Sequence, residues 1–418
     1  MIRAGRAIVA LALGVVLALG GATVAHADQV RTLEYWLNDY GISQAWSTSR
    51  GAGVKVAIID TGVDGTVPDL NGAVVGGTDV SGIGSANGQK PLGSTEESGH
   101  GTWVASLLAG RGTGDGNGVI GVAPEASILT VSVSLGSSPS TVSSDDQIAD
   151  GVRWAVDNGA KVINMSLTRN TLDWPESWDS AFQYAFAHDV VIVAAAGNRG
   201  SGTTEVGAPA TIPGVLTVAG VDRNGKASFD ASSQGITIGV SAPSEQLVGA
   251  NPGGGYVQWA GTSGAAPIVA GAVALVRAAH PELNAANVIN RIISTARPVG
   301  SVPSPVYGYG LLNANAAVTG VVAPVAANPM GDLGQWIHIH RRAQSTTPTQ
   351  GAQAPVPTST PRALGPDRTI GIGQLVVPRW DALTLFWIPF TLLAGFIILA
   401  SLGVTAAVLH FRRAGRRG

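Results

Sequence analysis

Short apolar runs alternate with helical stretches along the central part of the chain. The runs are rich in β-branched residues and lie at residues 54–59, 128–133, 161–164, 190–195 and 215–218. Between two of them, Ile148, Val152, Ala155 and Val156 recur at the spacing that lines one face of a helix. This alternation predicts an α/β fold of three layers, in which helices cover both sides of a mainly parallel central sheet. In such sheets, functional residues gather at the carboxyl ends of the strands.

The N-terminal residues 1–27 have the pattern of a secretory signal peptide. Arg3 and Arg6 precede an apolar stretch, and a small-residue cleavage site ends at Ala27. We therefore expect the mature, exported chain to begin at Asp28. A retained N-terminal anchor is the alternative, but the short apolar stretch and the cleavage site disfavour it.

A second apolar segment, residues 382–409, contains no charged residue. As a helix of roughly 28 residues it would span about 42 Å, more than the ~30 Å hydrocarbon core of a bilayer. Four arginines lie in the following tail, residues 410–418, whereas Arg379 and Asp381 nearly cancel on the other side. The positive-inside rule then predicts a single-pass protein whose tail is cytoplasmic and whose body is extracytoplasmic. A buried core helix is the alternative, which the length and the flanking arginines disfavour.

Residues 321–381 differ in composition from the rest of the chain: they are rich in Pro, Thr and Ala and poor in large apolar residues. A segment of this composition buries too little apolar surface to fold, so we expect a disordered linker. The folded domain then covers residues 28–320. His338 and His340 could suggest a metal pair, but without a third ligand we do not expect one.

The overall composition excludes several classes of function. The chain of 418 residues has a formal net charge of −2, which gives no electrostatic footprint for nucleic acid. It contains no cysteine, so thiolate catalysis, Cys-type zinc sites and disulfides are all excluded. No acidic loop commits the sequence to a calcium site.

Three short blocks carry an acid, a base and a nucleophile in a fixed order. Asp60 ends an apolar run, His100 opens an apolar helical stretch, and Ser263 opens another. A serine hydroxyl attacks an amide only when an imidazole accepts its proton and a carboxylate holds that imidazole in the right tautomer. At a helix start, the N–H group of Ser263 also points toward a developing oxyanion. We assign Ser263 as nucleophile, His100 as general base and Asp60 as its partner, a chemistry that requires no cofactor.

Each residue alone has an ordinary structural explanation. An aspartate after a strand is usually a turn or cap residue, a serine before a helix is often its N-cap, and Asn198 lies in a sequence typical of a turn. The joint order and context of the blocks favour the catalytic interpretation. Asp64 and Asp69 lie near the first block, and we interpret both as loop or capping residues.

The order Asp, His, Ser and the surrounding motifs resemble those of the subtilisin-like serine proteases, over roughly residues 30–318. The matching blocks are Val56-Ala-Ile-Ile-Asp60-Thr-Gly62, Ser98-Gly-His100-Gly-Thr102, Gly118-Val-Ile-Gly-Val-Ala-Pro124, Val162-Ile-Asn-Met-Ser-Leu167, Val193-Ala-Ala-Ala-Gly-Asn198, Gly261-Thr-Ser263-Gly-Ala-Ala-Pro267 and Tyr309-Gly-Leu-Leu-Asn-Ala314. The resemblance implies a subtilisin-like fold, serine endopeptidase activity on polypeptides, and Asn198 as a side-chain donor to the oxyanion.

The same resemblance implies where a substrate binds. Ser166, Leu167 and Thr168 would pair with an extended peptide as an added strand. Thr168 stands where the family usually has Gly, so we expect narrower access. Arg199 would lie at the lip of the pocket for the P1 side chain, where we expect it to disfavour basic residues. Gly264 replaces a bulkier residue often found in the family, which leaves the local shape open.

Among these proteases the chain is most similar to the mycosins, the membrane-anchored serine proteases of type VII secretion systems. The similarity rests on the short segment before the first strand, the Pro-rich linker, and the terminal anchor with its basic tail. It implies a peptidase that acts outside the cell membrane beside a secretion machine, whose membrane components are its partners. Two alternatives stay open: a general surface protease for exported proteins, and a mainly structural subunit of a secretion complex.

Overall fold

The computed structural model describes residues 29–341 apart from residues 94–97, 115, 136–139 and 203. These residues belong to the first of two units of the chain, Met1–Thr347, and the second unit, Pro348–Gly418, lies outside them. Four predicted segments also lie outside them and stay predictions: the signal peptide 1–27, the part of the linker at residues 342–381, the transmembrane helix 382–409 and the tail 410–418.

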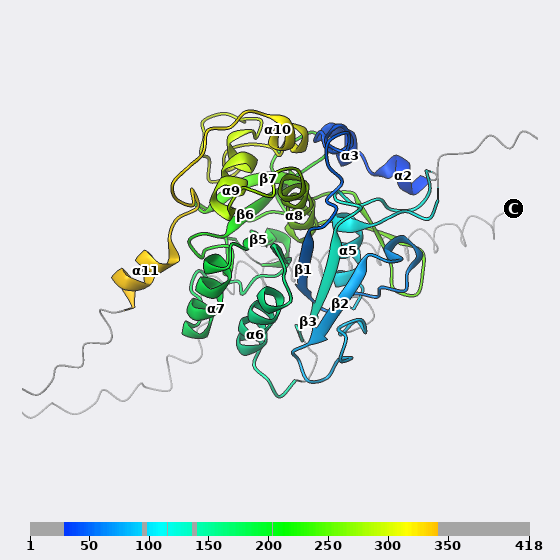
Figure 1. Cartoon of the computed structure of the whole chain (residues 1–418), viewed down its shortest axis with the longest axis horizontal. Coiled ribbons are helices and arrows are strands. Elements are labelled where there is room, and N and C mark those ends of the chain that lie inside the picture. Colours follow the sequence, from blue (N-terminus) through cyan, green and yellow to red (C-terminus); the bar gives the residue numbers. More distant parts are fainter. Residues whose placement is uncertain (1–28, 94–97, 115, 136–139, 203, 342–418) are drawn as a thin grey trace, which may run out of the picture. The chain divides into compact units, whose positions relative to one another are not determined.

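Seven parallel strands form the central sheet, in the order β2-β3-β1-β4-β5-β6-β7 (Figure 1). Their bounds are β1 Lys55–Asp60, β2 Val74–Asp79, β3 Ser127–Ser132, β4 Val162–Met165, β5 Val191–Ala195, β6 Leu216–Val221 and β7 Ile238–Pro243. The five predicted runs are confirmed as β1, β3, β4, β5 and β6, each within a few residues. In the parallel register of β1 and β3, Asp60 lies beside Ser132 at the carboxyl ends of both strands. The sheet therefore presents Asp60 near its middle, where functional residues were expected.

Helices cover both faces of the sheet and confirm the three-layer α/β fold (Figure 1). The longer helices are α5 His100–Ala109, α6 Ser144–Asp157, α7 Glu176–Ala187, α8 Thr262–Ala279 and α9 Ala285–Ser294. Alternate residues of β1 face two separate cores, as the pleat of a strand requires. Val56 and Ile58 belong to the core that contains α5 and α8, whereas Ala57 and Ile59 belong to the core of α6 and α7.

The helix α8 forms the centre of the larger core. It is buried from Thr262 to Arg277, and it consists mainly of Ala, Gly and Val, whose small side chains allow close packing under the strands. Among the described residues it is the one helix long and apolar enough to cross a membrane, but 83% of it is buried inside the domain. We therefore interpret α8 as a core helix, whose first turn carries Ser263.

The N-terminal segment belongs to the same domain, as expected. It forms the short helices α2 Gln29–Leu33, α3 Trp36–Asp39 and α4 Ile42–Ala45. Trp36 and Ile42 are fully buried in the core of α8, and Arg31 donates hydrogen bonds to the carbonyl oxygens of Asn117 and Gly118. These contacts join the segment to the body of the domain.

The prediction that all of residues 321–381 form a disordered linker is wrong for residues 321–341. This part of the chain follows α10 Ala314–Thr319 and ends in a second helix, α11 Leu333–His340. Leu333 is buried in the core of α6 and α7, and the ring of Trp336 lies 4.4 Å from that of Trp174. Arg341 pairs with Asp179 of α7 at 2.5 Å and lies over both indoles. A few apolar anchors thus fold a segment whose average composition predicts disorder.

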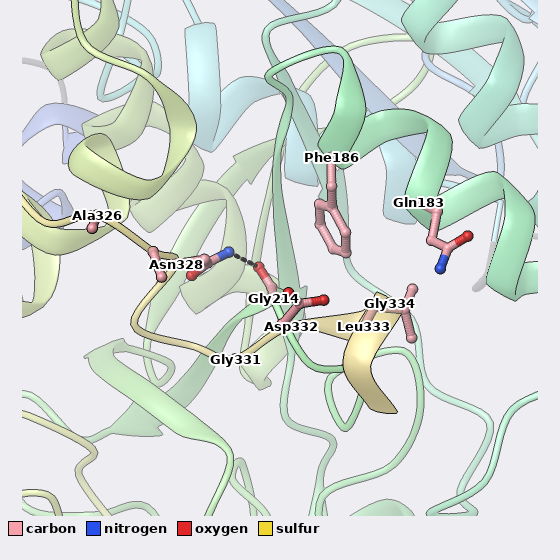
Figure 2. A pocket seen from close by; sticks show the side chains of 10 residues that line it. Gln183, Phe186, Gly214, Ala326, Asn328, Gly331, Asp332, Leu333 and Gly334 are labelled. Atoms are coloured by element: carbon pink, nitrogen blue, oxygen red, sulfur yellow. Dashed lines mark hydrogen bonds between the residues drawn. The ribbon is translucent and has the colours of Figure 1, made fainter. Parts of the chain in front are cut away.

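A cavity of about 430 Å³ lies between α7 and the chain that leads into α11 (Figure 2). Figure 2 shows Phe186 and Gln183 of α7 on one side and Leu333 on the other. Asn328 closes one end, where its Nδ2 atom donates to the carbonyl oxygen of Gly214 at 2.9 Å. The acidic group in the lining is Asp332, and its carboxylate caps the first turn of α11. We therefore interpret this cavity as a packing gap under the C-terminal segment.

Candidate active site

Asp60 is the last residue of β1, and its side chain is buried. Its Oδ1 atom accepts a hydrogen bond from the N–H group of Thr61, 2.7 Å away. Oδ1 and Oδ2 also lie 2.8 and 3.0 Å from Nδ1 of His100. The carboxylate therefore faces the imidazole with both oxygens, which is the geometry of a group that orients a histidine.

His100 is the first residue of α5, and backbone contacts hold this end of the helix beside β1. The N–H group of Gly101 donates to Oγ1 of Thr61 at 3.2 Å, and a Cβ at Gly101 would lie only 2.2 Å from the carbonyl oxygen of Gly62. Because Nδ1 faces Asp60, Nε2 is the ring nitrogen left to exchange a proton. Burial by itself lowers the pKa of His100, but the charge of Asp60 and its hydrogen bond outweigh burial and raise that pKa above its ordinary value.

Ser263 is the second residue of α8, where the chain turns sharply into the helix. The preceding Gly261 has a φ angle of +147°, a conformation that side chains disfavour. The carbonyl oxygen of Ser263 accepts a hydrogen bond of 2.8 Å from Oγ of Ser166, which follows β4. This bond joins the start of α8 to the carboxyl end of a strand next to β1.

Asn198 follows β5 and contacts the same turn. Its Oδ1 atom accepts hydrogen bonds from the N–H and Oγ1 groups of Thr262, at 2.8 and 2.9 Å. The amide oxygen is thus occupied, and Nδ2 is the atom left to donate. A Cβ placed on Gly261 would lie 3.0 Å from both Nδ2 of Asn198 and Oγ of Ser263, so these two atoms border the same small space. Since α5 packs against α8, the Asp60–His100 pair and this pair lie on adjoining elements.

Ser166, Leu167 and Thr168 border a cavity of about 510 Å³ between the ends of β3 and β4 and the start of α6. Ser166 is buried and bonded to the start of α8, and it therefore ties one end of this cavity to Ser263. Thr168 turns its Oγ1 atom toward the N–H group of Asn170, 3.2 Å away. An ion pair between Arg169 and Asp145 closes another side of the cavity.

Arg199 lies directly after Asn198, at the start of the short 3-10 helix η2 Arg199–Ser201. Its guanidinium stacks on the ring of Phe229, with 4.7 Å between Cζ and the ring centroid. The N–H group of Gly200 donates to the carbonyl oxygen of Asp230 at 2.9 Å. The Arg199 side chain thus contacts an exposed ring, and Arg199 does not border the cavity of Ser166, Leu167 and Thr168.

The acidic and histidine residues set aside above have structural roles. Oδ1 of Asp64 accepts hydrogen bonds from the N–H and Oγ1 groups of Thr66, which is the pattern of an Asx turn. Oδ1 of Asp69 accepts a 2.6 Å bond from the N–H group of Val119. Asp64 is therefore a loop residue, as interpreted, whereas Asp69 is a buried residue of the short 3-10 helix Pro68–Leu70 that binds the backbone of a neighbouring segment. His340 lies on α11, and its ring is 4.8 Å from that of Trp336.

Sequence reasoning missed two tryptophans beside the imidazole. Trp103 follows His100 by three residues on α5, and their rings are 6.2 Å apart. Trp259 ends the strand β9 Tyr256–Trp259, and its ring is 5.6 Å from that of His100. The helical i,i+3 spacing was a usable signal for Trp103. No such signal exists for Trp259, because the contact joins distant parts of the chain.

The model of the subtilase family of peptidases, Peptidase_S8, matches residues 51–310. The chain belongs to the subtilase family. Subtilisin DY from Bacillus licheniformis is 40% identical to this subtilase over 271 residues, which cover 64% of the chain and 92% of that protein. Subtilisin E from Bacillus subtilis is 40% identical over 287 residues, 66% of the chain and 70% of that protein. Membership in this family makes the chain a serine-type endopeptidase.

Solved structures of mycosins resemble this subtilase over most of its described part. The MycP3 protease from the type VII (ESX-3) secretion system is 33% identical, with a TM-score of 0.59, over 69% of this chain and 88% of that one. MycP1 from Mycobacterium smegmatis is 30% identical, with a TM-score of 0.59, over 70% of this chain and 88% of that one. The subtilase is thus related both to subtilisins and to mycosins.

Proposed function

We propose that this subtilase is a membrane-anchored serine endopeptidase that hydrolyses exported polypeptides with Asp60, His100 and Ser263. One observation carries the proposal. Both oxygens of the Asp60 carboxylate face Nδ1 of His100, at 2.8 and 3.0 Å, at the end of a strand that contacts α8, the helix whose first turn carries Ser263. This arrangement leaves Nε2 of His100 free of the carboxylate and able to accept the proton of a serine hydroxyl.

The reaction follows from these roles. Oγ of Ser263 attacks the carbonyl carbon of the scissile bond while Nε2 of His100 takes its proton. Asp60 stabilises the imidazolium that forms, and the C–N bond breaks as His100 gives the proton to the leaving amine. Water then attacks the acyl-enzyme by the same route, with His100 again as base and then acid. The carboxylic acid product leaves and Ser263 regains its proton.

Asn198 and the start of α8 stabilise the charge that develops on the carbonyl oxygen. Nδ2 of Asn198 borders the same space as Oγ of Ser263, and the N–H group of Ser263 lies in the first turn of α8. Two donors and the positive end of the helix dipole then converge on the oxyanion. Because Oδ1 of Asn198 is held by Thr262, the amide needs no reorganisation when the charge appears.

We infer that the substrate lies along Ser166, Leu167 and Thr168 and occupies the cavity that they border. Arg199 is not among the residues that border this cavity, but it follows Asn198 directly in the chain. We propose that its guanidinium, stacked on Phe229, disfavours Lys and Arg at P1 by like-charge repulsion. A peptide library with all residues at P1 tests this point. The expected result is low turnover after Lys and Arg that rises in Arg199→Ala, and strong cleavage after basic residues in the unaltered protein would contradict it.

The membrane anchoring and the secretion context form the finer part of the proposal. The apolar segment 382–409 and the arginines after it support an anchored protein with an extracytoplasmic catalytic domain. The similarity to MycP1 and MycP3 supports a role beside a type VII secretion system, with the membrane components of that system as partners.

Secretion assays distinguish cleavage from scaffolding. We expect a strain that lacks the chain to lose secretion of its substrates, and a strain with Ser263→Ala to lose their processing. Loss of secretion in both strains would assign the essential role to catalysis. Full secretion and normal processing in the Ser263→Ala strain, with the protein present at its usual level, would contradict the proposed function.

A further inference from the structure

Two indole rings lie near the imidazole of His100, in addition to the carboxylate of Asp60. The ring of Trp103 lies 6.2 Å from the imidazole at an interplanar angle of 62°, and that of Trp259 lies 5.6 Å away at 73°. The two indoles also meet each other, at 5.6 Å and 51°. Edge-on contacts of this kind are favourable for aromatic pairs and fix their relative orientation.

Glycine at position 264, near the start of α8, leaves space that Trp259 occupies. A Cβ on Gly264, the residue after the nucleophile, would lie 2.1 Å from Cδ1 of Leu247 and 3.2 Å from Cη2 of Trp259. The space that a larger residue would occupy is therefore filled by the strand β8 Leu247–Ala250 and by Trp259. The indole of Trp259 thus contacts both the imidazole and the turn that carries Ser263. Leu247 and Trp259 therefore determine the local shape of the site at Gly264.

The hairpin of β8 and β9 fixes both indoles. Nε1 of Trp103 donates to Oδ1 of Asn251 at 3.0 Å, in the turn between these antiparallel strands. A Cβ at Gly249 would lie 2.9 Å from Cβ of Trp103 and 3.3 Å from Nε1 of Trp259, so the β8 backbone packs directly against both residues. Nε1 of Trp259 is buried without a hydrogen-bond partner among the described residues. Packing alone therefore places Trp259 beside His100.

We propose that Trp103 and Trp259 are positioning residues that hold the His100 imidazole with Nδ1 toward Asp60 and Nε2 toward Ser263. The inference rests on the proposed triad. His100 is the first residue of α5, and its side chain is 23% exposed. If Asp60 were its only partner, the imidazole ring could still tilt about the Nδ1–carboxylate hydrogen bond. The two indole rings that contact the imidazole restrict this freedom. Small errors in the position of a general base reduce its rate steeply.

The test compares Trp259→Ala with Trp259→Phe in the full chain, purified in detergent. One readout is the rate at which a small fluorophosphonate labels Ser263, since this reagent has no peptide part that could contact an indole. The other is kcat and KM on a peptide. We expect Trp259→Ala to lower both the labelling rate and kcat about three- to tenfold with little change in KM, and Trp259→Phe to recover most of the loss. A wild-type labelling rate in Trp259→Ala, or a rise in KM alone, would overturn the inference.

Gly264→Ala tests the same point without removing a ring. Its methyl group displaces Leu247 and Trp259, so we expect a similar loss of labelling rate, which Leu247→Ala in the same chain partly restores. No loss in folded Gly264→Ala would overturn the inference. His100→Ala serves as the control for the triad itself. If it labels at the wild-type rate, the proposed function fails; if it does not label and Trp259→Ala labels normally, only the positioning role fails.

Discussion

Asp60 and His100 act as one unit at the scale of single residues. The carboxylate is buried and bonded to Nδ1 of the imidazole, so it holds both the tautomer and the orientation of the ring. We expect Asp60→Asn to lower kcat about 10⁴-fold, because an amide that donates toward Nδ1 favours the wrong tautomer. Steady-state cleavage of a peptide measures the loss. Asp64→Asn, in the neighbouring Asx turn, is the matched control and should lose far less.

The same substitution should move the pH profile. In the proposed mechanism the imidazole must be neutral to accept a proton, and Asp60 raises the pKa of His100. The acid limb of kcat/KM for the unaltered protein therefore lies above the ordinary histidine value of about 6.5. In Asp60→Asn the negative charge is gone while burial remains, so the pKa falls and the limb moves to lower pH. If the acid limb of kcat/KM stays at the same pH in Asp60→Asn, that limb reports the ionisation of a group other than His100.

The amide of Asn198 has two separable tasks. Its oxygen holds Thr262, and its Nδ2 atom borders the reaction space. We expect Asn198→Ala to lower kcat about 10²–10³-fold with little effect on KM, since the lost hydrogen bond forms chiefly in the transition state. The comparison is Asn224→Ala, an exposed amide in a distant turn. A rise in KM at constant kcat would instead assign Asn198 to substrate binding.

At the scale of elements, α11 acts as an anchor for the C-terminal segment. Arg341 pairs with Asp179, which is only 9% exposed, and donates to the carbonyl oxygen of Trp174 at 3.0 Å. Arg341→Ala leaves that carboxylate without this partner, and we expect the free energy of unfolding to fall by about 1–3 kcal/mol. Urea unfolding of the purified protein measures the change. Peptide cleavage should stay normal, and a large loss of activity would show that α11 is coupled to the site.

The sequence predicts the strands of the sheet best where they are buried on both faces. β1, β3 and β5 are runs of β-branched residues, because each packs against a helix layer on either side. β2 was not predicted, since it is half-exposed at the edge of the sheet and contains Gly76 and Gly77. α11 was not predicted either, because the average composition of residues 321–381 concealed the short apolar group that begins with Leu333 and Trp336. The packing of α11 against α7 stabilises it, and a local sequence pattern does not reveal such a tertiary contact.

The residues of the candidate site were predictable because each stands at one end of a helix or strand that the local sequence indicates. Asp60 after a strand and His100 and Ser263 at helix starts are local signals, and the parallel sheet brings such ends to one edge. The surroundings of these residues were not predictable. The Trp259–His100 contact and the fit of Leu247 into the space at Gly264 depend on a hairpin that packs from elsewhere in the chain.

At the scale of the whole molecule, the described residues form one catalytic domain that continues to Arg341 rather than to residue 320. The folded domain therefore includes residues 321–341, the first part of the linker predicted before the anchor at 382–409. The proposed protease would then work close to the outer surface of the membrane, on polypeptides that emerge there.

The central claim is that Ser263 is a nucleophile activated by His100 and Asp60. The most direct measurement is mass spectrometry of the full chain after reaction with a small fluorophosphonate. We predict one added phosphonyl group, located on the peptide that contains Ser263, and no labelling in Ser263→Ala or His100→Ala. Labelling at another serine, or peptide cleavage that persists in Ser263→Ala, would contradict the account.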